Sequence, residues 1–158
     1  MRFLTRAWRT GAMPELWEGR VQALYLQHLK DLNPPLPQEA MALALEINLH
    51  DGLLRRFDLD REAHTLGMCF RAGDLQVGYF DLDLRYSRVN VDAASERTLR
   101  QALGQRSFQL LDHELDGTST AGWSHRFLFA PEGEAEVTFG SVQWATTPRP
   151  DRFGDTAA

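Results

Sequence analysis

Two of the five histidines, His113 and His125, lie in stretches where apolar and polar residues alternate, and we expect these stretches to be neighbouring β-strands. In both strands the histidine falls among the apolar residues, which face the interior. A connecting loop that is symmetric about Ser119 pairs the two histidines directly, with their Cβ atoms about 5 Å apart. Two imidazoles at that distance can share a divalent metal ion or a proton, and His50 is the candidate for a third member of the site.

The alternative for these histidines is structural. A buried histidine is commonly neutral and donates its ring N–H to a carbonyl or hydroxyl group. The same strand pairing predicts Asp112 opposite Arg126, on the face that we expect to meet water together with Glu114 and Asp116. Both interpretations, a metal or catalytic site and a hydrogen-bonded core, stay open from the sequence.

Other residues with suitable chemistry have ordinary explanations. Asp58-Leu59-Asp60 and Asp81-Leu82-Asp83 put paired carboxylates on one strand face, where they can hold Mg²⁺ or Ca²⁺, but they also fit the polar side of a half-exposed strand. Cys69 lies near Arg71, a cation that can lower the pKa of a thiol, and is otherwise an ordinary strand cysteine. No G-x-S-x-G, G-x-x-x-x-G-K-[ST] or G-x-G-x-x-G sequence occurs, which excludes the standard nucleophile elbow and the commonest nucleotide-binding loops.

A candidate binding surface lies near the N-terminus, where Trp8 stands between Arg6 and Arg9 ahead of the first strong helical pattern. Tryptophan and arginine concentrate among the residues that dominate the energetics of protein interfaces. The alternative is that this segment docks on the sheet to stabilise the fold, which is common for the termini of small domains.

These residues must be positioned by two helices and a series of strands. Apolar residues recur at three- and four-residue spacing over residues 14–32, which predicts an amphipathic helix. The sequence Asn33-Pro34-Pro35-Leu36-Pro37 ends that helix, because proline cannot continue it. A second helix is predicted over residues 38–48. After Gly52 the period of the apolar residues changes to two, which predicts β-strands.

Six strands are predicted in this second part of the chain. The first two form a hairpin in which Leu59 pairs with Leu66 and Phe57 with Met68, because this register keeps all four apolar residues on one face. A change of alternation near Gly78 predicts a β-bulge in the third strand. The strands are expected over residues 53–60, 65–71, 75–86, 107–116, 123–130 and 134–147, with a short helix over residues 92–104.

The predicted fold is α+β: an N-terminal helical hairpin followed by a curved, mainly antiparallel sheet of about six strands with one inserted short helix. The strands form either one curved sheet or two sheets packed face to face. With 158 residues, of which 43% are hydrophobic and 25% charged, the chain is expected to form a single domain over residues 1–150, followed by a disordered tail over residues 151–158.

The composition also limits the partners. A net charge of −5 argues against nucleic acid, which requires a basic surface on the protein. No apolar stretch approaches the ~20 residues of a membrane-spanning helix, so we expect no membrane partner. The single cysteine cannot form an internal disulfide, which favours a cytoplasmic location.

The segment Phe3-Leu4-Thr5-Arg6-Ala7-Trp8, together with Leu49-His50-Asp51 and Gly78-Tyr79-Phe80-Asp81-Leu82, resembles a family of small bacterial proteins of unknown function that open with an F-T-x-x-W motif. The resemblance implies no activity and no catalytic residue. The histidine–aspartate pair at the first strand is also similar to some toxin-immunity proteins, which act by binding.

The sequence therefore favours a bacterial, cytoplasmic, non-catalytic binding domain that binds a protein partner or a second copy of itself and needs no cofactor. The alternative is a metal-dependent enzyme or a small-ligand binder that uses the inward-facing histidines His113, His125 and His50, with a divalent metal as its cofactor.

Overall fold

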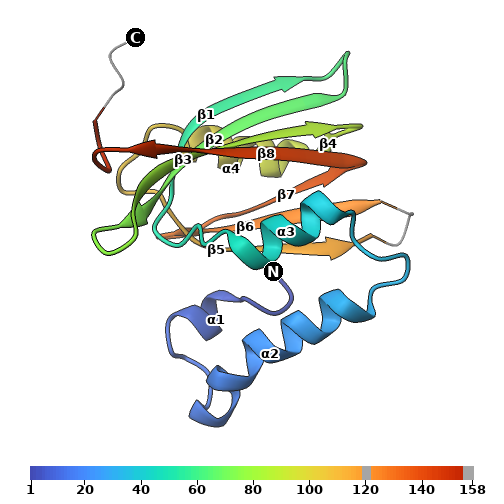
Figure 1. Ribbon diagram of the computed structural model, residues 1–158, viewed down its shortest axis with the longest axis vertical. Helices are drawn as coiled ribbons and strands as arrows, with labels where there is room; N and C mark the ends of the chain where they lie inside the picture. Colours follow the sequence, from blue (N-terminus) through green and yellow to red (C-terminus); the bar gives the residue numbers. More distant parts are fainter. Residues whose placement is uncertain (119–121, 155–158) are drawn as a thin grey trace.

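The computed structural model describes residues 1–118 and 122–154, without the side chains of residues 15–18. Within these residues the strands form two antiparallel four-stranded sheets, and the fold is α+β (Figure 1). The first sheet contains, in spatial order, β1 (Leu53–Asp60), β2 (Thr65–Asp74), β3 (Gly78–Ser87) and β8 (Ser141–Arg149). The second sheet contains β4 (Asn90–Val91), β7 (Glu134–Phe139), β6 (Trp123–Ala130) and β5 (Gln109–Gly117).

The described helices are α1 (Arg6–Arg9), α2 (Glu15–Asp31), α3 (Gln38–Glu46) and α4 (Ala93–Ala102). Helix α3 packs against β8 and β5, and α4 packs against β7 and β1, so each of these helices bridges the two sheets. Helices α1 and α2 lie together at the end of the molecule beyond β5 (Figure 1). Helix α4 begins after Asp92, whose carboxylate accepts a hydrogen bond from the backbone N–H of Ser95 at 2.6 Å, as expected for an N-cap.

The hydrophobic core lies between the two sheets. The rings of Phe70 from the first sheet and Phe127 from the second are stacked with their centroids 5.5 Å apart, and both side chains are fully buried. Full burial of a side chain of this size contributes roughly 1.5–3 kcal/mol to stability, so this contact between the sheets stabilises the fold.

The two helices predicted ahead of Gly52 and the first β-hairpin are confirmed. Leu59 pairs with Leu66 and Phe57 with Met68 in the β1–β2 ladder, as the burial of one strand face requires. Between β6 and β7, Gly133 has a φ of 114° and its carbonyl accepts a hydrogen bond from Phe129, which closes the short loop predicted there.

The third strand predicted over residues 75–86 is present as β3, but its predicted start at residue 75 and the bulge near Gly78 are wrong. Asp74 pairs directly with Gly78, so residues 75–77 form the tip of a hairpin and the β2–β3 register is regular. One carboxylate oxygen of Asp74 accepts the backbone N–H groups of Gln76 and Val77, and the side chains of Leu75 and Val77 are 91% and 78% exposed. The change of alternation in the sequence marks this turn.

The strand predicted over residues 134–147 is two strands, β7 and β8. The chain passes from the second sheet to the first at Gly140, whose backbone N–H bonds to the carbonyl of Ser87. In the sequence, the apolar residues change from odd positions (Val137, Phe139) to even positions (Val142, Trp144) at Gly140, and this change of phase marks the change of sheet. This division, together with the two-residue strand β4, gives eight described strands in place of about six.

Part of the segment predicted as a disordered tail contacts the first sheet. The guanidinium of Arg71 donates hydrogen bonds to the carbonyl oxygens of Asp151 and Gly154 at 3.0 and 3.1 Å, and Arg152 donates to the carbonyl of Asp51. Residues 155–158 lie outside the described part of the chain. None of the described helices combines the length and the apolar character needed to cross a bilayer.

Candidate functional site

His113 and His125 are joined by a hydrogen bond in the core. The Nδ1 atom of His113 lies 2.9 Å from Nε2 of His125. On one side, Nδ1 of His125 lies 2.7 Å from the hydroxyl of Tyr86, which comes from β3 in the opposite sheet. On the other side, Nε2 of His113 lies 3.1 Å from the carbonyl oxygen of Ile47, at the end of α3. A continuous polar chain therefore crosses the core between the sheets.

The partners fix the direction of this chain. A backbone carbonyl only accepts, so Nε2 of His113 carries the hydrogen that it donates to Ile47. With both imidazoles neutral, Nδ1 of His113 then accepts from Nε2–H of His125, and Nδ1 of His125 accepts from the hydroxyl of Tyr86. Every ring nitrogen has one partner, and both lone pairs are engaged.

Burial keeps both rings neutral. Desolvation lowers the pKa of His113 and lowers that of His125 well below its ordinary value, and it raises the pKa of Tyr86 well above its own. The side chains of His125 and Tyr86 are 0% and 2% exposed. The structural interpretation of the two histidines therefore fits this geometry.

The predicted pairing of the strands is wrong by two residues. His113 pairs with Phe127 and Leu115 pairs with His125, so the two imidazoles meet diagonally and not directly. A shift of two residues leaves each side chain on its predicted face, which is why the rings still meet. Asp112 pairs with Leu128 and not with Arg126, and a register shift separates Leu110 from Asp112. Ser119, the expected centre of the loop, lies outside the described residues.

The shared-metal arrangement does not fit these positions. Two imidazole nitrogens bound to one tetrahedral zinc lie about 3.3 Å apart and each offers a lone pair to the metal. Here the nitrogens are 2.9 Å apart with a hydrogen between them. His50 does not join them, because its Nδ1 bonds to the carbonyl of Leu111 at 2.9 Å. No group of three or more metal-ligating side chains is present among the described residues.

The two D-x-D sequences and the cysteine have structural partners. Asp81 lies between the guanidinium groups of Arg71 and Arg149; burial alone would raise its pKa, but these hydrogen bonds lower it. Asp58 and Asp83 both contact Arg56.

The single cysteine is not activated. Burial raises the pKa of Cys69 to about 11, so Arg71 does not activate this thiol.

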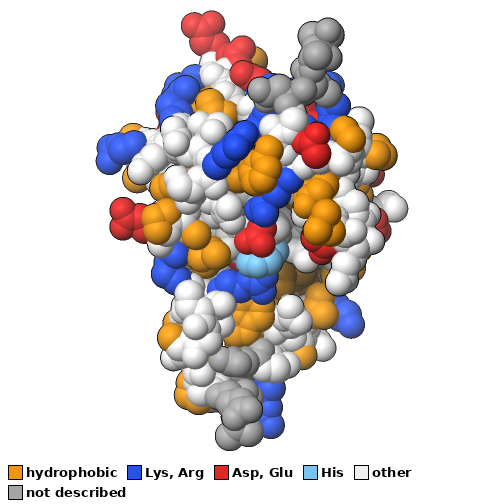
Figure 2. Space-filling model, turned by 90° about the vertical axis from the view of Figure 1, so that its left-hand side faces the viewer, with side chains coloured by type: hydrophobic (Ala, Val, Ile, Leu, Met, Phe, Trp, Pro, Cys, Tyr) orange, Lys and Arg blue, Asp and Glu red, His pale blue; other side chains and the backbone are white. Residues whose placement is uncertain are grey.

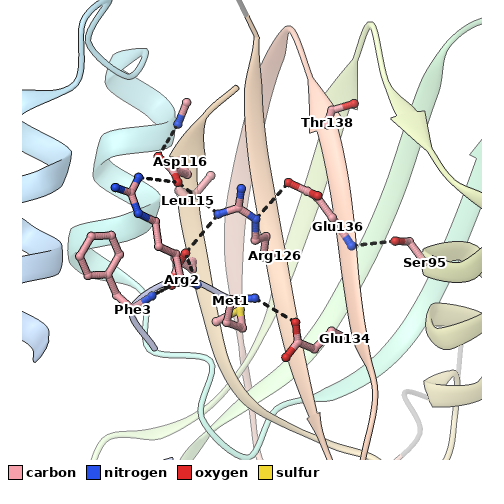
Figure 3. Close-up of polar contacts among 12 residues, drawn as sticks. Met1, Arg2, Phe3, Ser95, Leu115, Asp116, Arg126, Glu134, Glu136 and Thr138 are labelled. Carbon is pink, nitrogen blue, oxygen red and sulfur yellow. Dashed lines mark hydrogen bonds and ion pairs between the residues drawn. The ribbon is translucent and has the colours of Figure 1, made fainter. Parts of the chain in front are cut away.

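The acidic face of β5 is buried, which contradicts the prediction that it meets water. The carboxylate of Glu114 is 0% exposed and accepts hydrogen bonds from the backbone N–H groups of Arg2, Phe3 and Leu4, at distances of 2.7–3.1 Å. Arg126 reaches both Glu114 and Asp116, and extends to Glu136 on β7 (Figure 3). The N-terminal segment therefore covers this face of the sheet.

Of the predicted binding residues, Arg6 has a structural role. It donates hydrogen bonds to the carbonyl oxygens of Phe129 and Pro131 at 2.6 and 2.9 Å and so attaches α1 to the end of β6. Trp8 is partly buried against the core. The guanidinium of Arg9 lies over the Trp8 ring, 5.6 Å from its centroid. The alternative predicted for this segment, docking for stability, fits Arg6.

The outer edge of β5 is closed by side chains and by a short bridge. The hydroxyl of Tyr25 on α2 accepts from the backbone N–H of Leu115 at 2.7 Å and donates to its carbonyl at 3.1 Å. Leu110 exchanges backbone hydrogen bonds with Asp51 and Gly52, both at 2.8 Å. With the imidazole of His50 on the carbonyl of Leu111, the outward-facing backbone groups of Leu110 and Leu115 and this carbonyl have partners.

The edges beside β7 and β1 are also covered or charged. Strand β4 pairs with the end of β7, and the hydroxyl of Ser95 accepts from the backbone N–H of Glu136 at 3.0 Å. At β1, Gly104 donates to the carbonyl of Leu54, and four of the eight side chains of the strand are charged. Charged side chains, irregularities and covering segments are the usual protection of exposed edge strands.

Helix α3 packs against β8, and the strand ends in Pro148 and Arg149, but over Ser141–Thr147 its outer edge has no paired strand in the described structure. Its backbone hydrogen bonds in the described structure are those of the β3 ladder. The residues from Ser141 to Thr147 include no charged side chain, and five of these seven residues are exposed. Helix α3 approaches the strand through the side chain of Trp144, whose Nε1 donates to the carbonyl of Glu39 at 3.0 Å.

No family model matches the chain, and a search of curated proteins found no match.

Proposed function

We propose that this protein is a non-catalytic binding domain that acts through the outer edge of β8, and that the strand it receives there is β8 of a second copy. The observation that carries the proposal is the combination of an open edge and seven uncharged residues at β8. Such an edge presents unpaired N–H and C=O groups to an incoming strand, and main-chain hydrogen bonds then supply the affinity.

A second copy suits this edge because antiparallel pairing about a two-fold axis at the middle of β8 places the central residue beside its own copy and the flanking residues symmetrically about it. A charged residue near the axis would lie close to its own copy, and Ser141–Thr147 includes no charged residue. The strand includes Val142, Trp144 and two threonines, which form favourable cross-strand pairs. Leu45 on the adjacent helix α3 is 56% exposed and adds apolar surface beside the edge.

Two earlier expectations belong to this proposal. The bacterial, cytoplasmic setting rests on the motif resemblance and the single cysteine. The immunity-like alternative shares the same chemistry, with a foreign strand at β8 in place of a second copy. The histidine-based enzyme gains no support, because both lone pairs of the pair His113 and His125 are engaged.

The test uses charges at Ala145, an exposed residue in the middle of β8. We expect the unmodified protein to sediment as a dimer at micromolar concentration. Ala145→Lys and Ala145→Glu should each sediment as monomers, because like charges then face each other across the two-fold axis. An equimolar mixture of the two variants should sediment as a dimer again.

The matched control is Ala23→Lys, the same substitution at an exposed position on α2, which should leave the dimer intact. Circular dichroism checks that all variants are folded. A monomeric unmodified protein throughout the micromolar range would refute the proposal, as would dimers that persist in both Ala145 variants. A monomer whose β8 amides become protected from exchange only with a foreign protein would favour the immunity-like alternative.

A further inference from the structure

A pocket of about 330 Å³ opens where α1, α2, α3 and β5 meet, and His113 lies in its wall. This volume is at the lower end of the range for small-molecule sites, so the pocket suits a ligand of few atoms. Leu4, Leu26, Ala44 and Ile47 supply apolar walls. Figure 2 shows the side of the molecule that carries α1, where a histidine side chain lies between acidic and basic side chains near the middle of the surface.

Asp112 supplies one charge to this pocket and differs from the other acids of β5. Glu114 and Asp116 each contact Arg126. Asp112 has no cation in ion-pair contact among the described side chains, and its one hydrogen bond there comes from the backbone N–H of its neighbour His113. Burial raises the pKa of Asp112, while the adjacent His113 and, more weakly, Arg9 and His50 oppose this shift. Its carboxylate therefore lacks the partner that a part-buried charge needs.

Arg9 supplies the opposite charge. Its guanidinium lines the same pocket and is placed by its contact with the ring of Trp8. None of the described carboxylates is in ion-pair contact with it, whereas Arg126 and Arg71 each have such partners. A planar guanidinium with free donors matches a carboxylate in bidentate geometry.

We propose that this pocket binds a small zwitterion with an apolar side chain, such as a free aliphatic amino acid, with its ammonium group on Asp112 and its carboxylate on Arg9. The apolar walls take the side chain. Binding is not followed by chemistry at His113, because both nitrogens of that imidazole are already hydrogen-bonded. The site is separate from β8 and goes beyond the proposed self-association.

The test is isothermal titration with three probes of matched shape. Leucine carries both charges, 4-methylpentanoate carries the carboxylate alone, and 3-methylbutylamine carries the ammonium alone. Leucine should bind, and each single-charge probe should bind at least about tenfold more weakly, because one charge-assisted contact is lost. Equal affinity for leucine and one of the single-charge probes, or no heat with leucine at millimolar concentration, would overturn the proposal.

Asp112→Asn and Arg9→Gln should each abolish leucine binding, while Asp58→Asn, at an exposed acid elsewhere, should not change it. Asparagine keeps the side-chain oxygen that accepts from His113, so Asp112→Asn should fold. It should also melt at a higher temperature than the unmodified protein without ligand, because an unpaired buried charge is removed. Leucine binding that survives Asp112→Asn would refute the assignment. The monomeric Ala145→Lys variant should bind leucine unchanged, so this test does not depend on the dimer.

Discussion

Strands β5 and β8 both lie at the margin of a sheet, but their outer edges are treated differently. At β5, a tyrosine hydroxyl, an imidazole and a backbone bridge occupy the outward-facing groups. At β8, the described structure provides no such partners, and water must satisfy the same kinds of groups. Helix α2 and residues 50–52 thus close one edge, while the C-terminal part of the chain leaves the other accessible.

The difference extends to the interior. The sheet that contains β5 also carries the buried histidines and the paired acids Glu114 and Asp116. Each of these groups depends on a specific partner from a distant part of the chain. In contrast, most side chains of β8 between Ser141 and Thr147 are exposed to solvent. Substitutions on the β5 side should therefore affect stability, and substitutions on β8 should affect association.

The largest expected effect is the pH dependence of the histidine pair. Desolvation lowers the pKa values of His113 and His125 in the folded state, so the unfolded chain binds protons more readily below its own histidine pKa of about 6.5. Stability is therefore lost as the pH falls. Between pH 7.5 and pH 5 the free energy of unfolding should decrease by up to about 4 kcal/mol.

Chemical denaturation at the two pH values measures this loss. His64→Asn, at an exposed turn residue with a φ of 53° that asparagine tolerates, should show the same loss as the unmodified protein. A stability that is flat or increases on acidification would contradict the neutral, buried pair.

Removal of the tyrosine hydroxyl at β5 should have the next largest effect. Tyr25→Phe leaves both the N–H and the carbonyl of Leu115 without their partner in a buried place. The free energy of unfolding should decrease by about 3 kcal/mol. Tyr79→Phe, at a half-buried tyrosine, should change it by less than about 0.5 kcal/mol. Urea denaturation measures both changes. If Tyr25→Phe and Tyr79→Phe lower the free energy of unfolding by similar amounts, the Tyr25 hydroxyl does not stabilise the β5 edge as proposed.

Two serines give a smaller, paired comparison. Ser95→Ala removes the acceptor for the backbone N–H of Glu136 at the β7 edge and should cost about 1 kcal/mol. Ser141→Ala removes a hydroxyl at the exposed start of β8, where water can replace its contact with Ser87, and should cost less than about 0.5 kcal/mol. Thermal unfolding of both variants tests the order, and a larger cost at Ser141 would contradict it.

The smallest effect on stability is expected at the centre of the open edge. Gln143→Lys places a charge on an exposed β8 residue and should change the free energy of unfolding of the isolated monomer by less than about 0.5 kcal/mol. The same substitution should weaken self-association in sedimentation experiments, since protective lysines on edge strands act in this way. A large loss of stability without a change in association would reverse the roles of the two edges.

The parts of the fold that local alternation determines could be predicted. The β1–β2 register follows from Leu59 and Phe57, and the inward placement of His113 and His125 survives a register error because that error is an even number of residues. The turn at Asp74 was missed because Leu75 and Val77 continue the apolar alternation beyond the end of the strand. The paired glycines were the available signal: Gly73 has a φ of 98°, and a Cβ there would lie 2.1 Å from the carbonyl oxygen of Gly78.

The closed edge and the charged face of β5 could not be predicted in the same way. Glu114 bonds to backbone groups more than 100 residues away, and Tyr25 reaches Leu115 across 90 residues. No local pattern specifies such partners. A signal existed in the alternating acids Asp112, Glu114 and Asp116, because several carboxylates on one strand need cations or amide donors from elsewhere.

The hydrogen-bonded relay from Tyr86 through His125 and His113 to Ile47 has a consequence for how uniquely the molecule is defined. Leucine and phenylalanine side chains alone can interdigitate in several alternative stackings of nearly equal energy. The hydrogen-bonded chain is compatible with only one of these stackings. If one sheet slid against the other, three buried polar side chains would lose their hydrogen-bond partners. The hydrogen bonds among Tyr86, His125 and His113 therefore favour a single alignment of the two sheets.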